Sequence, residues 1–230
     1  MEHQHLLYQE SGKYNPTGLI LTAIAFLLLS VVLGYVYVLI TSFIPLIYVN
    51  VLITIGLGIL LGYLVRVAKR ISHNRNTKSM VILAAVFGLL TCYFMWVAYL
   101  LYIANGAVMP GISDYLNSLL WITEPGSFFS LISVINSVGA WSVFGLTFSG
   151  ILLALVWLVE MAIIIGAPVL TIFGSDPYPY SESLGTWYPK YTLSEEFAAV
   201  SAPTSLINEL QVAPVKTIEE LGMGTAHHFS

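Results

Sequence analysis

Long apolar runs alternate with short polar segments along this chain. Residues 17–44 contain no charged side chain, and an α-helix of that length measures about 42 Å. The hydrocarbon core of a bilayer is about 30 Å thick, so one such helix crosses it with some tilt or overhang. Similar runs cover residues 46–68, 80–104 and 141–168. The pattern predicts an all-α membrane protein with four transmembrane helices.

Two shorter patterns fill the segment between the third and fourth runs. The stretches "SDYLNSLLWI" and "EPGSFFSLISVINSVG" predict helices over about 113–122 and 125–137. Pro125 suits the first turn of the second helix. The apolar side chains of this helix share one face: Phe128, Leu131, Ile132 and Ile135. An amphipathic helix of this kind lies in the membrane interface, so we expect external interfacial helices that act as a structural cap or as a gate over a cavity.

The composition excludes a water-soluble globular fold. Of the 230 residues, 57% are hydrophobic and 9% are charged, whereas about a quarter are charged in soluble domains. With four spans, all the basic residues fall on one side: Lys13, Arg66, Lys69, Arg70, Arg75, Lys78, Lys190 and Lys216. The positive-inside rule then predicts a protein of the cell (inner) membrane with both termini in the cytoplasm.

Three segments follow from this topology. Residues 1–16 form a cytoplasmic N-terminal segment, residues 17–171 form the transmembrane domain, and residues 172–230 form a small, acidic cytoplasmic tail that is mostly helical or irregular. The candidate partner-binding side chains of the tail are Trp187, Tyr191, Phe197, Leu206 and Leu210. Tyr and Trp are enriched at binding hot spots, although near the membrane they also pack at the interface. We expect a cytoplasmic protein partner, a homo-oligomer or both, and no nucleic acid, because the tail is acidic.

Gly58 and Gly62 lie four residues apart inside the second run. Their surroundings in "GLGILLGYL" superficially suggest a nucleotide fingerprint, but no strand precedes them. Small residues at this spacing let a second helix approach closely. We therefore interpret them as a helix-packing site, either within the bundle or between protomers.

Glu160 is the one charged residue of the apolar stretch 151–170. A carboxylate in hydrocarbon is costly, so it normally pairs, takes up a proton or faces water. If the span ends near Pro168, Glu160 lies in the inner half of the membrane, and Arg66 of the second span is then its expected partner. Two alternatives stay open, which are a solvated cytoplasmic vestibule with Glu160 on its wall and a proton or cation site.

No catalytic or metal-binding pattern stands out. The histidines are His3, His5, His73, His227 and His228, and none are spaced four residues apart as they are in helical metal sites. The chain has no HExxH motif and no Ser/His/Asp set at membrane depth. We therefore expect no enzyme activity, no metal and no cofactor.

Several stretches resemble a group of uncharacterised bacterial four-pass membrane proteins. They are "YQESGKYNPTG", "FIPLIYVNVL", "EPGSFFSLISVINSVGAWSVFG", "VWLVEMAIII" and "PYPYSESLGTWYPK". The resemblance implies the four-span topology and carries no activity or site residue with it. It also implies a chain shorter than the group's usual length, which continues past the point matching "HHFS".

Two functions remain after these exclusions. The first is a non-catalytic membrane anchor or scaffold that recruits a cytoplasmic partner through its tail. The alternative is a small oligomeric channel or transporter whose path includes Glu160. Polar side chains within the spans are scattered, which favours the first function.

Overall fold

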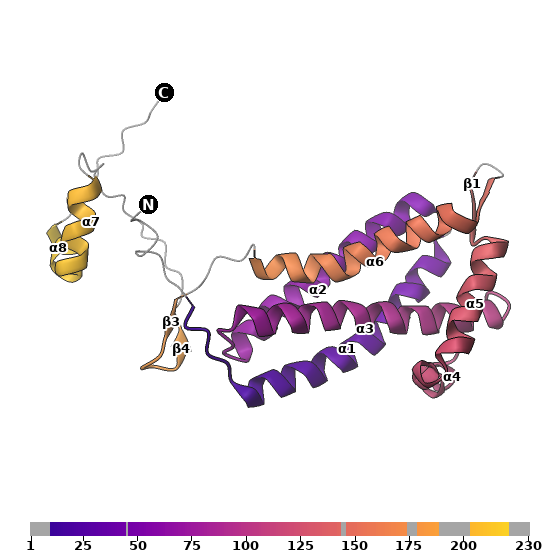
Figure 1. Cartoon of the computed structure of the whole chain (residues 1–230), viewed down its shortest axis with the longest axis horizontal. Helices are drawn as coiled ribbons and strands as arrows, with labels where there is room; N and C mark the ends of the chain where they lie inside the picture. The colour runs from indigo at the N-terminus through magenta and orange to yellow at the C-terminus, as the bar shows by residue number, and fades with distance from the viewer. Residues whose placement is uncertain (1–9, 45, 144–145, 174–178, 189–202, 221–230) are drawn as a thin grey trace, which may run out of the picture. The chain divides into compact units, whose positions relative to one another are not determined.

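The computed structural model describes residues 10–44, 46–143, 146–173, 179–188 and 203–220. The chain divides into two compact units, Met1–Tyr188 and Pro189–Ser230, and each is described by itself. Figure 1 labels the helices and strands. The first unit contains the four long helices and the candidate site.

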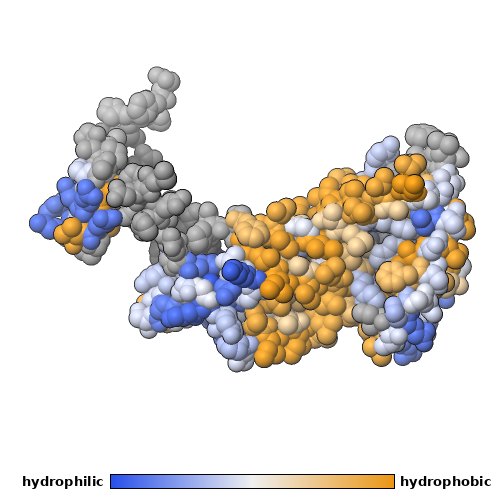
Figure 2. Space-filling model, viewed as in Figure 1, coloured by the Kyte–Doolittle hydropathy of each residue, from blue (hydrophilic) through white to orange (hydrophobic). Residues whose placement is uncertain are grey.

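Four long helices confirm the predicted membrane architecture. They are α1 (Pro16–Phe43), α2 (Ile47–Ile71), α3 (Thr77–Ala104) and α6 (Gly150–Phe173). Each is long and apolar enough to cross a membrane. Figure 2 shows a broad apolar zone over these helices, with polar residues gathered toward the ends of the bundle. The chain is thus an all-α integral membrane protein, with four spans among the described residues.

The ends of the helices follow from local sequence chemistry. Pro16 occupies the first turn of α1, where its missing N–H group costs no hydrogen bond. The side chain of Asn76 caps α3 by accepting a hydrogen bond from the Ser79 backbone N–H at 2.9 Å. Between α2 and α3 the chain reverses at His73, whose φ is 51°. The cap at Asn76 and the reversal at His73 allow a short connection between α2 and α3.

The helices do not pack in the order of the chain. The extensive contacts join α1 to α3, α3 to α6 and α6 to α2, whereas α1 and α2 touch far less. Two glycines allow the close approaches: Gly34 of α1 lies against the backbone of Met95, and Gly88 of α3 lies against the backbone of Ile165. Because α1 and α2 are not closely packed on each other, space remains between them for side chains from α3 and α6.

The fourth span does not begin where the sequence pattern suggested. Residues Trp141–Val143 and Leu146–Phe148 form two short antiparallel strands, β1 and β2, and the helix starts only at Gly150. Pro168 lies inside α6 and does not end it. Prolines are tolerated within transmembrane helices because neighbouring groups satisfy the freed carbonyl. The predicted span 141–168 is therefore displaced, and Glu160 lies near the middle of the helix.

Short helices connect α3 with α6, as the sequence predicted. They are α4 (Ile112–Asn117), the 3-10 helix η2 (Leu119–Thr123) and α5 (Pro125–Val138). On the expected apolar face of α5, Phe128 is buried and Ile132 and Ile135 pack against the core, whereas Leu131 is exposed. Tyr115 ties this segment to the bundle because its hydroxyl donates to the Val31 carbonyl at 2.8 Å.

The second unit contains two short helices, α7 (Pro203–Val212) and α8 (Pro214–Glu220), which contact each other. Leu206 and Leu210 of α7 are half-buried. The Thr217 hydroxyl of α8 donates at 2.9 Å to the carbonyl of Ala213, the residue before the helix. The predicted tail of residues 172–230 is therefore split between the two units, because residues up to Tyr188 belong to the first unit.

Candidate functional site

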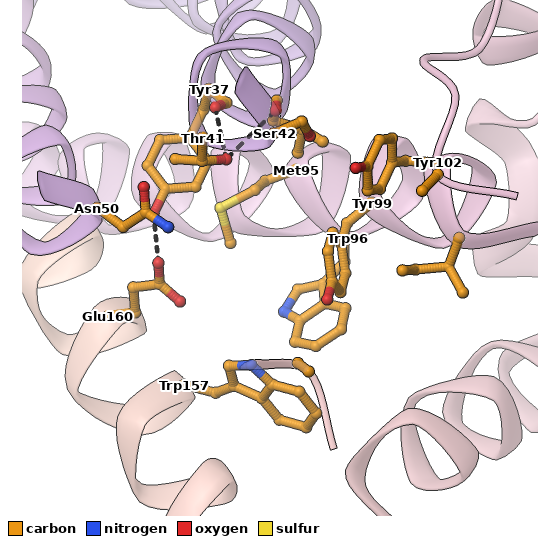
Figure 3. A pocket seen from close by; sticks show the side chains of 14 residues that line it. Tyr37, Thr41, Ser42, Asn50, Met95, Trp96, Tyr99, Tyr102, Trp157 and Glu160 are labelled. Atoms are coloured by element: carbon orange, nitrogen blue, oxygen red, sulfur yellow. Dashed lines mark hydrogen bonds between the residues drawn. The ribbon is translucent and has the colours of Figure 1, made fainter. Parts of the chain in front are cut away.

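The candidate site is built around the Glu160 carboxylate. Its Oε1 atom accepts a hydrogen bond from the Tyr37 hydroxyl of α1 (Figure 3). The Thr54 hydroxyl of α2 lies 3.3 Å from the same oxygen and 2.7 Å from the Tyr37 hydroxyl. Thr54 is itself anchored, because its hydroxyl also lies within hydrogen-bond distance of the Asn50 carbonyl at 2.9 Å. Side chains from three helices therefore converge on one carboxylate.

A cavity of about 300 Å³ opens beside this cluster. Drug-sized ligand pockets begin at about this volume. Its lining comes from the end of α1, the start of α2, the end of α3 and the first half of α6, with Ala107 and Ala140 from the connecting segments. Both alanines belong to the segment between α3 and α6, so the cavity extends from that end of the bundle down to Glu160.

Aromatic rings form much of the cavity wall (Figure 3). The Trp96 and Trp157 rings meet edge to face with centroids 4.8 Å apart. Tyr99 lies edge-on to Trp96, and Tyr102 stacks on Tyr99 at 6.4 Å. The face of an aromatic ring carries partial negative charge and attracts cations. The wall is therefore suited to a positively charged guest beside Glu160.

A second opening, an apolar crevice of about 300 Å³, lies between α2 and α6. Its lining residues are Asn50, Val51, Thr54, Leu155, Val156, Val159, Glu160 and Ile163. Three of these side chains, Val51, Leu155 and Val159, are about half exposed. Exposed apolar side chains on membrane-spanning helices face lipid, so the crevice opens toward the bilayer. Glu160 and Asn50 border both the crevice and the cavity.

Two oxygens of the lining residues have no hydrogen-bond partner among the described residues. The Oδ1 atom of Asn50 is buried without a hydrogen-bond partner. Within the described part of the chain, the hydrogen bonds to Glu160 end on Oε1, and Figure 3 shows its other oxygen directed away from them. Buried polar atoms in proteins are normally satisfied. The site therefore offers acceptors that suit a ligand with N–H donors.

The expected pair between Glu160 and Arg66 is not formed. Arg66 is exposed and lies twelve residues beyond Thr54 on the same helix, a distance of about 18 Å. Among the described residues, the ion pairs join other groups and none includes Glu160. The prediction was wrong because it assumed that the span ends at Pro168, whereas α6 continues to Phe173.

Gly58 and Gly62 both face α6 within the same chain. A Cβ atom on Gly58 would lie 3.0 Å from the Ala167 Cβ, and one on Gly62 would lie 2.3 Å from the Thr171 hydroxyl oxygen. These glycines let α2 and α6 approach on the side away from the cavity mouth. The structure thus places them at a contact within the bundle.

Trp187, an expected partner-binding residue, is engaged within the first unit. It lies in strand β4 (Thr186–Trp187), which pairs with β3 (Tyr180–Ser181). Its indole N–H donates to the Arg70 carbonyl at the end of α2 at 3.0 Å, and its ring meets Tyr180 edge to face. Leu206 and Leu210 lie in α7, whereas Tyr191 and Phe197 lie outside the described residues.

Charged side chains also attach the β3–β4 pair to the rest of the first unit. The Glu182 carboxylate lies 3.5 Å from Lys13 and 3.5 Å from Arg75, and it accepts a hydrogen bond from the Ser11 hydroxyl at 2.8 Å. This hydrogen bond and the two cations hold the pKa of Glu182 below its usual range. We call this region, formed by residues 10–15, 69–78 and 179–188, the basic end of the bundle.

Sequence reasoning selected Glu160 but missed most of the residues around it: Tyr37, Asn50, Thr54, Trp96, Tyr99, Tyr102 and Trp157. One usable signal was present. Trp96, Tyr99 and Tyr102 recur every three residues, and residues three apart share a face of a helix. Trp157 and Glu160 have the same spacing on α6. An aromatic face on the third span, and a tryptophan that shares a helix face with Glu160, were therefore visible in the sequence.

The described residues contain no group of three or more His, Cys, Asp or Glu side chains that could hold a metal ion. Comparison of the chain with known protein families, with curated proteins and with solved structures gives no match. The geometry of the site therefore carries the functional argument.

Proposed function

We propose that this integral membrane protein binds a small organic cation that carries N–H donors, such as an ammonium or a guanidinium group, in the cavity at Glu160. One observation carries the proposal: a membrane-embedded carboxylate lies on an aromatic wall, and among the described residues its hydrogen-bond partners are hydroxyl groups and not cations. The proposed activity is non-catalytic, and it develops the alternative in which Glu160 lines a path.

Charge supports this choice of ligand. A carboxylate in the membrane is expensive unless it is compensated, and a bound cation supplies the missing charge. The rings of Trp96 and Trp157 add cation–π attraction, about 2 kcal/mol or more at a desolvated site. The free acceptor of Asn50 favours a cation with N–H groups over a quaternary ammonium ion. An anion is disfavoured by the Glu160 carboxylate and by the ring faces.

The arrangement favours a binding site over an open channel. On the side of Glu160 toward the basic end, the core contains fully buried side chains from three helices: Leu61, Val65, Phe87 and Ile164. Phe26 and Phe87 stack there with ring centroids 4.2 Å apart. A through-going pore would need this packing to open. The cavity therefore suits a receptor, or a carrier that changes shape after binding.

We propose that the basic end faces the cytoplasm of the cell (inner) membrane and that the cavity mouth faces outward. Support comes from the positive-inside rule, because Lys13, Lys69, Arg70, Arg75 and Lys78 gather at the basic end. Cysteines at the exposed positions Ser113 and Lys78, in a Cys92→Ser background, would report the orientation. An impermeant reagent on intact cells should label the first and spare the second, and the opposite pattern would refute it.

Methylguanidinium is a suitable first ligand because guanidinium stays charged at all working pH values. A ligand that binds only the native state stabilises it by about 2.7 kcal/mol at one hundred times Kd. This corresponds to a rise in melting temperature of about 5–11 °C for a chain of this size. We expect this rise for the wild type in lipid nanodiscs and none for Glu160→Gln. If methylguanidinium changes the melting temperature of the two proteins by the same amount, the proposal is refuted.

Recruitment of a cytoplasmic partner is a second candidate function. It is favoured by the division of the chain, in which Pro189–Ser230 forms a compact unit of its own. Trp187 no longer supports this function, because it is engaged at the basic end. Deletion of residues 189–230 should leave the melting temperature of the membrane unit unchanged and remove any copurifying protein. Retention of every copurifying protein would exclude recruitment by this unit.

A further inference from the structure

The apolar crevice between α2 and α6 has no use in binding a fully water-soluble cation. Glu160 and Asn50 border both this crevice and the aromatic cavity. The remaining lining of the crevice is aliphatic except for Thr54, and three of its side chains face lipid. A continuous route therefore leads from the bilayer to the carboxylate.

We propose, resting on the cation-binding function above, that the ligand is a single-chain cationic amphiphile. Its head group, an ammonium or guanidinium, lies between Glu160 and Asn50 against the aromatic wall, and its alkyl chain lies in the crevice. The ligand enters sideways from the lipid between α2 and α6.

The depth of Glu160 supports a single-chain amphiphile. Glu160 follows the start of α6 by ten residues, about 15 Å along the helix. At this depth a phospholipid would have to carry its phosphate into the membrane beside a carboxylate, which both solvation and charge repulsion oppose. A cationic head group without phosphate meets no such penalty, because Glu160 neutralises it.

The head group also has to donate hydrogen bonds. Asn50 offers a buried acceptor without a partner, and the Glu160 hydrogen bonds within the described residues occupy only Oε1. An acceptor left unpaired in a buried site costs binding energy. A quaternary ammonium head matches the charge but leaves both acceptors unpaired, so it should bind more weakly than a guanidinium head.

The test compares two ligands that share one head group, methylguanidinium and dodecylguanidinium, in nanodiscs of zwitterionic phosphatidylcholine. Empty nanodiscs give the background from partitioning into lipid. Val159→Trp fills the crevice, and Leu158→Trp places the same bulk on an exposed neighbour that does not line it. Binding of methylguanidinium by Val159→Trp shows that the variant is folded.

We expect Val159→Trp to weaken dodecylguanidinium binding about tenfold or more, since overpacking excludes the chain, and to leave methylguanidinium binding unchanged. Leu158→Trp should bind both ligands as the wild type does. Dodecyltrimethylammonium should bind the wild type about tenfold more weakly than dodecylguanidinium, because its head group donates no hydrogen bond.

The outcomes separate the two proposals. If neither ligand binds the wild type, the cation-binding function itself is wrong. If methylguanidinium binds but Val159→Trp leaves dodecylguanidinium binding unchanged, the crevice is not the chain site and only the present inference fails. Equal weakening of both ligands by Val159→Trp would also overturn it, as would equal affinities for the two dodecyl head groups.

Discussion

The Tyr37 hydroxyl donates a hydrogen bond to the Glu160 carboxylate, although 123 positions of sequence separate the two residues. Tyr37 is buried in the core of the bundle, so its ring fixes where the hydroxyl lies. The contact orients the carboxylate toward the aromatic cavity and joins α1 to α6. It is the central structural relationship of the candidate site.

Removal of this donor should be costly. We expect Tyr37→Phe to lower the free energy of unfolding by about 1.5–3 kcal/mol, the usual contribution of a hydrogen bond to a charged group. Tyr48→Phe is the matched control, because Tyr48 is 73% exposed on α2. Thermal melts of both variants in nanodiscs measure the difference. Equal melting temperatures would show that the contact does not stabilise the fold.

The distance between Glu160 and Arg66 predicts independent effects. Glu160→Gln and Arg66→Met should change the free energy of unfolding additively, within about 0.5 kcal/mol, because distant sites do not couple. The double variant should therefore show the sum of the two single effects. Recovery of stability in the double variant would show that Glu160 and Arg66 form an ion pair after all, and would contradict the separation seen in the structure.

Gly88 controls how closely α3 and α6 approach. A Cβ atom there would lie 2.7 Å from the Ile165 Cα and 2.9 Å from the Ile164 carbonyl oxygen, so the backbones have to separate. We expect Gly88→Ala to destabilise the protein by about 1–3 kcal/mol. At Gly56 nothing lies within 4 Å, so Gly56→Ala should be neutral or slightly stabilising. The prediction fails if the two variants melt alike.

The basic end should respond to acid through Glu182. Its pKa is lowered in the folded protein, so its contribution to stability is present above the unfolded value of about 4.3. It is lost as the pH falls through the lowered folded value. The difference in melting temperature between wild type and Glu182→Gln should hold steady at higher pH and shrink below about pH 4.3.

Glu124→Gln provides the control for this experiment, since Glu124 is exposed and lies in the segment between α3 and α6. The difference in melting temperature between Glu124→Gln and the wild type should not show the pH profile described for Glu182→Gln. A Glu182→Gln difference that stays constant down to pH 3 would contradict the role of the carboxylate at the basic end.

The four spans were predictable because uninterrupted apolar runs of this length have few other uses. The start of the fourth was not, since "WSVFGLTF" is itself largely apolar and carries no charge. Hydropathy alone does not separate a short strand from a helix. The better signals were Gly139 and Gly150, which bracket the two strands with φ angles of 97° and 60°.

The site was only partly predictable for a different reason. A single carboxylate within an apolar run is easily recognised in the sequence, but its partners depend on which helices touch and at which positions. Here α2 packs against α6 at a register that places Glu160 beside Thr54, twelve residues from Arg66 on the same helix, and Tyr37 reaches the carboxylate from α1. The crevice likewise arises from the spacing of α2 and α6, which no single stretch of sequence records.

Direct calorimetric titration tests the central claim, that Glu160 binds a cation in the aromatic cavity. Methylguanidinium would be titrated into nanodiscs that contain the wild type, Glu160→Gln or the control Glu124→Gln. We expect saturable binding at one site per chain for the wild type and the control, and none for Glu160→Gln. Undiminished binding by Glu160→Gln, or no binding by the wild type, would contradict the account.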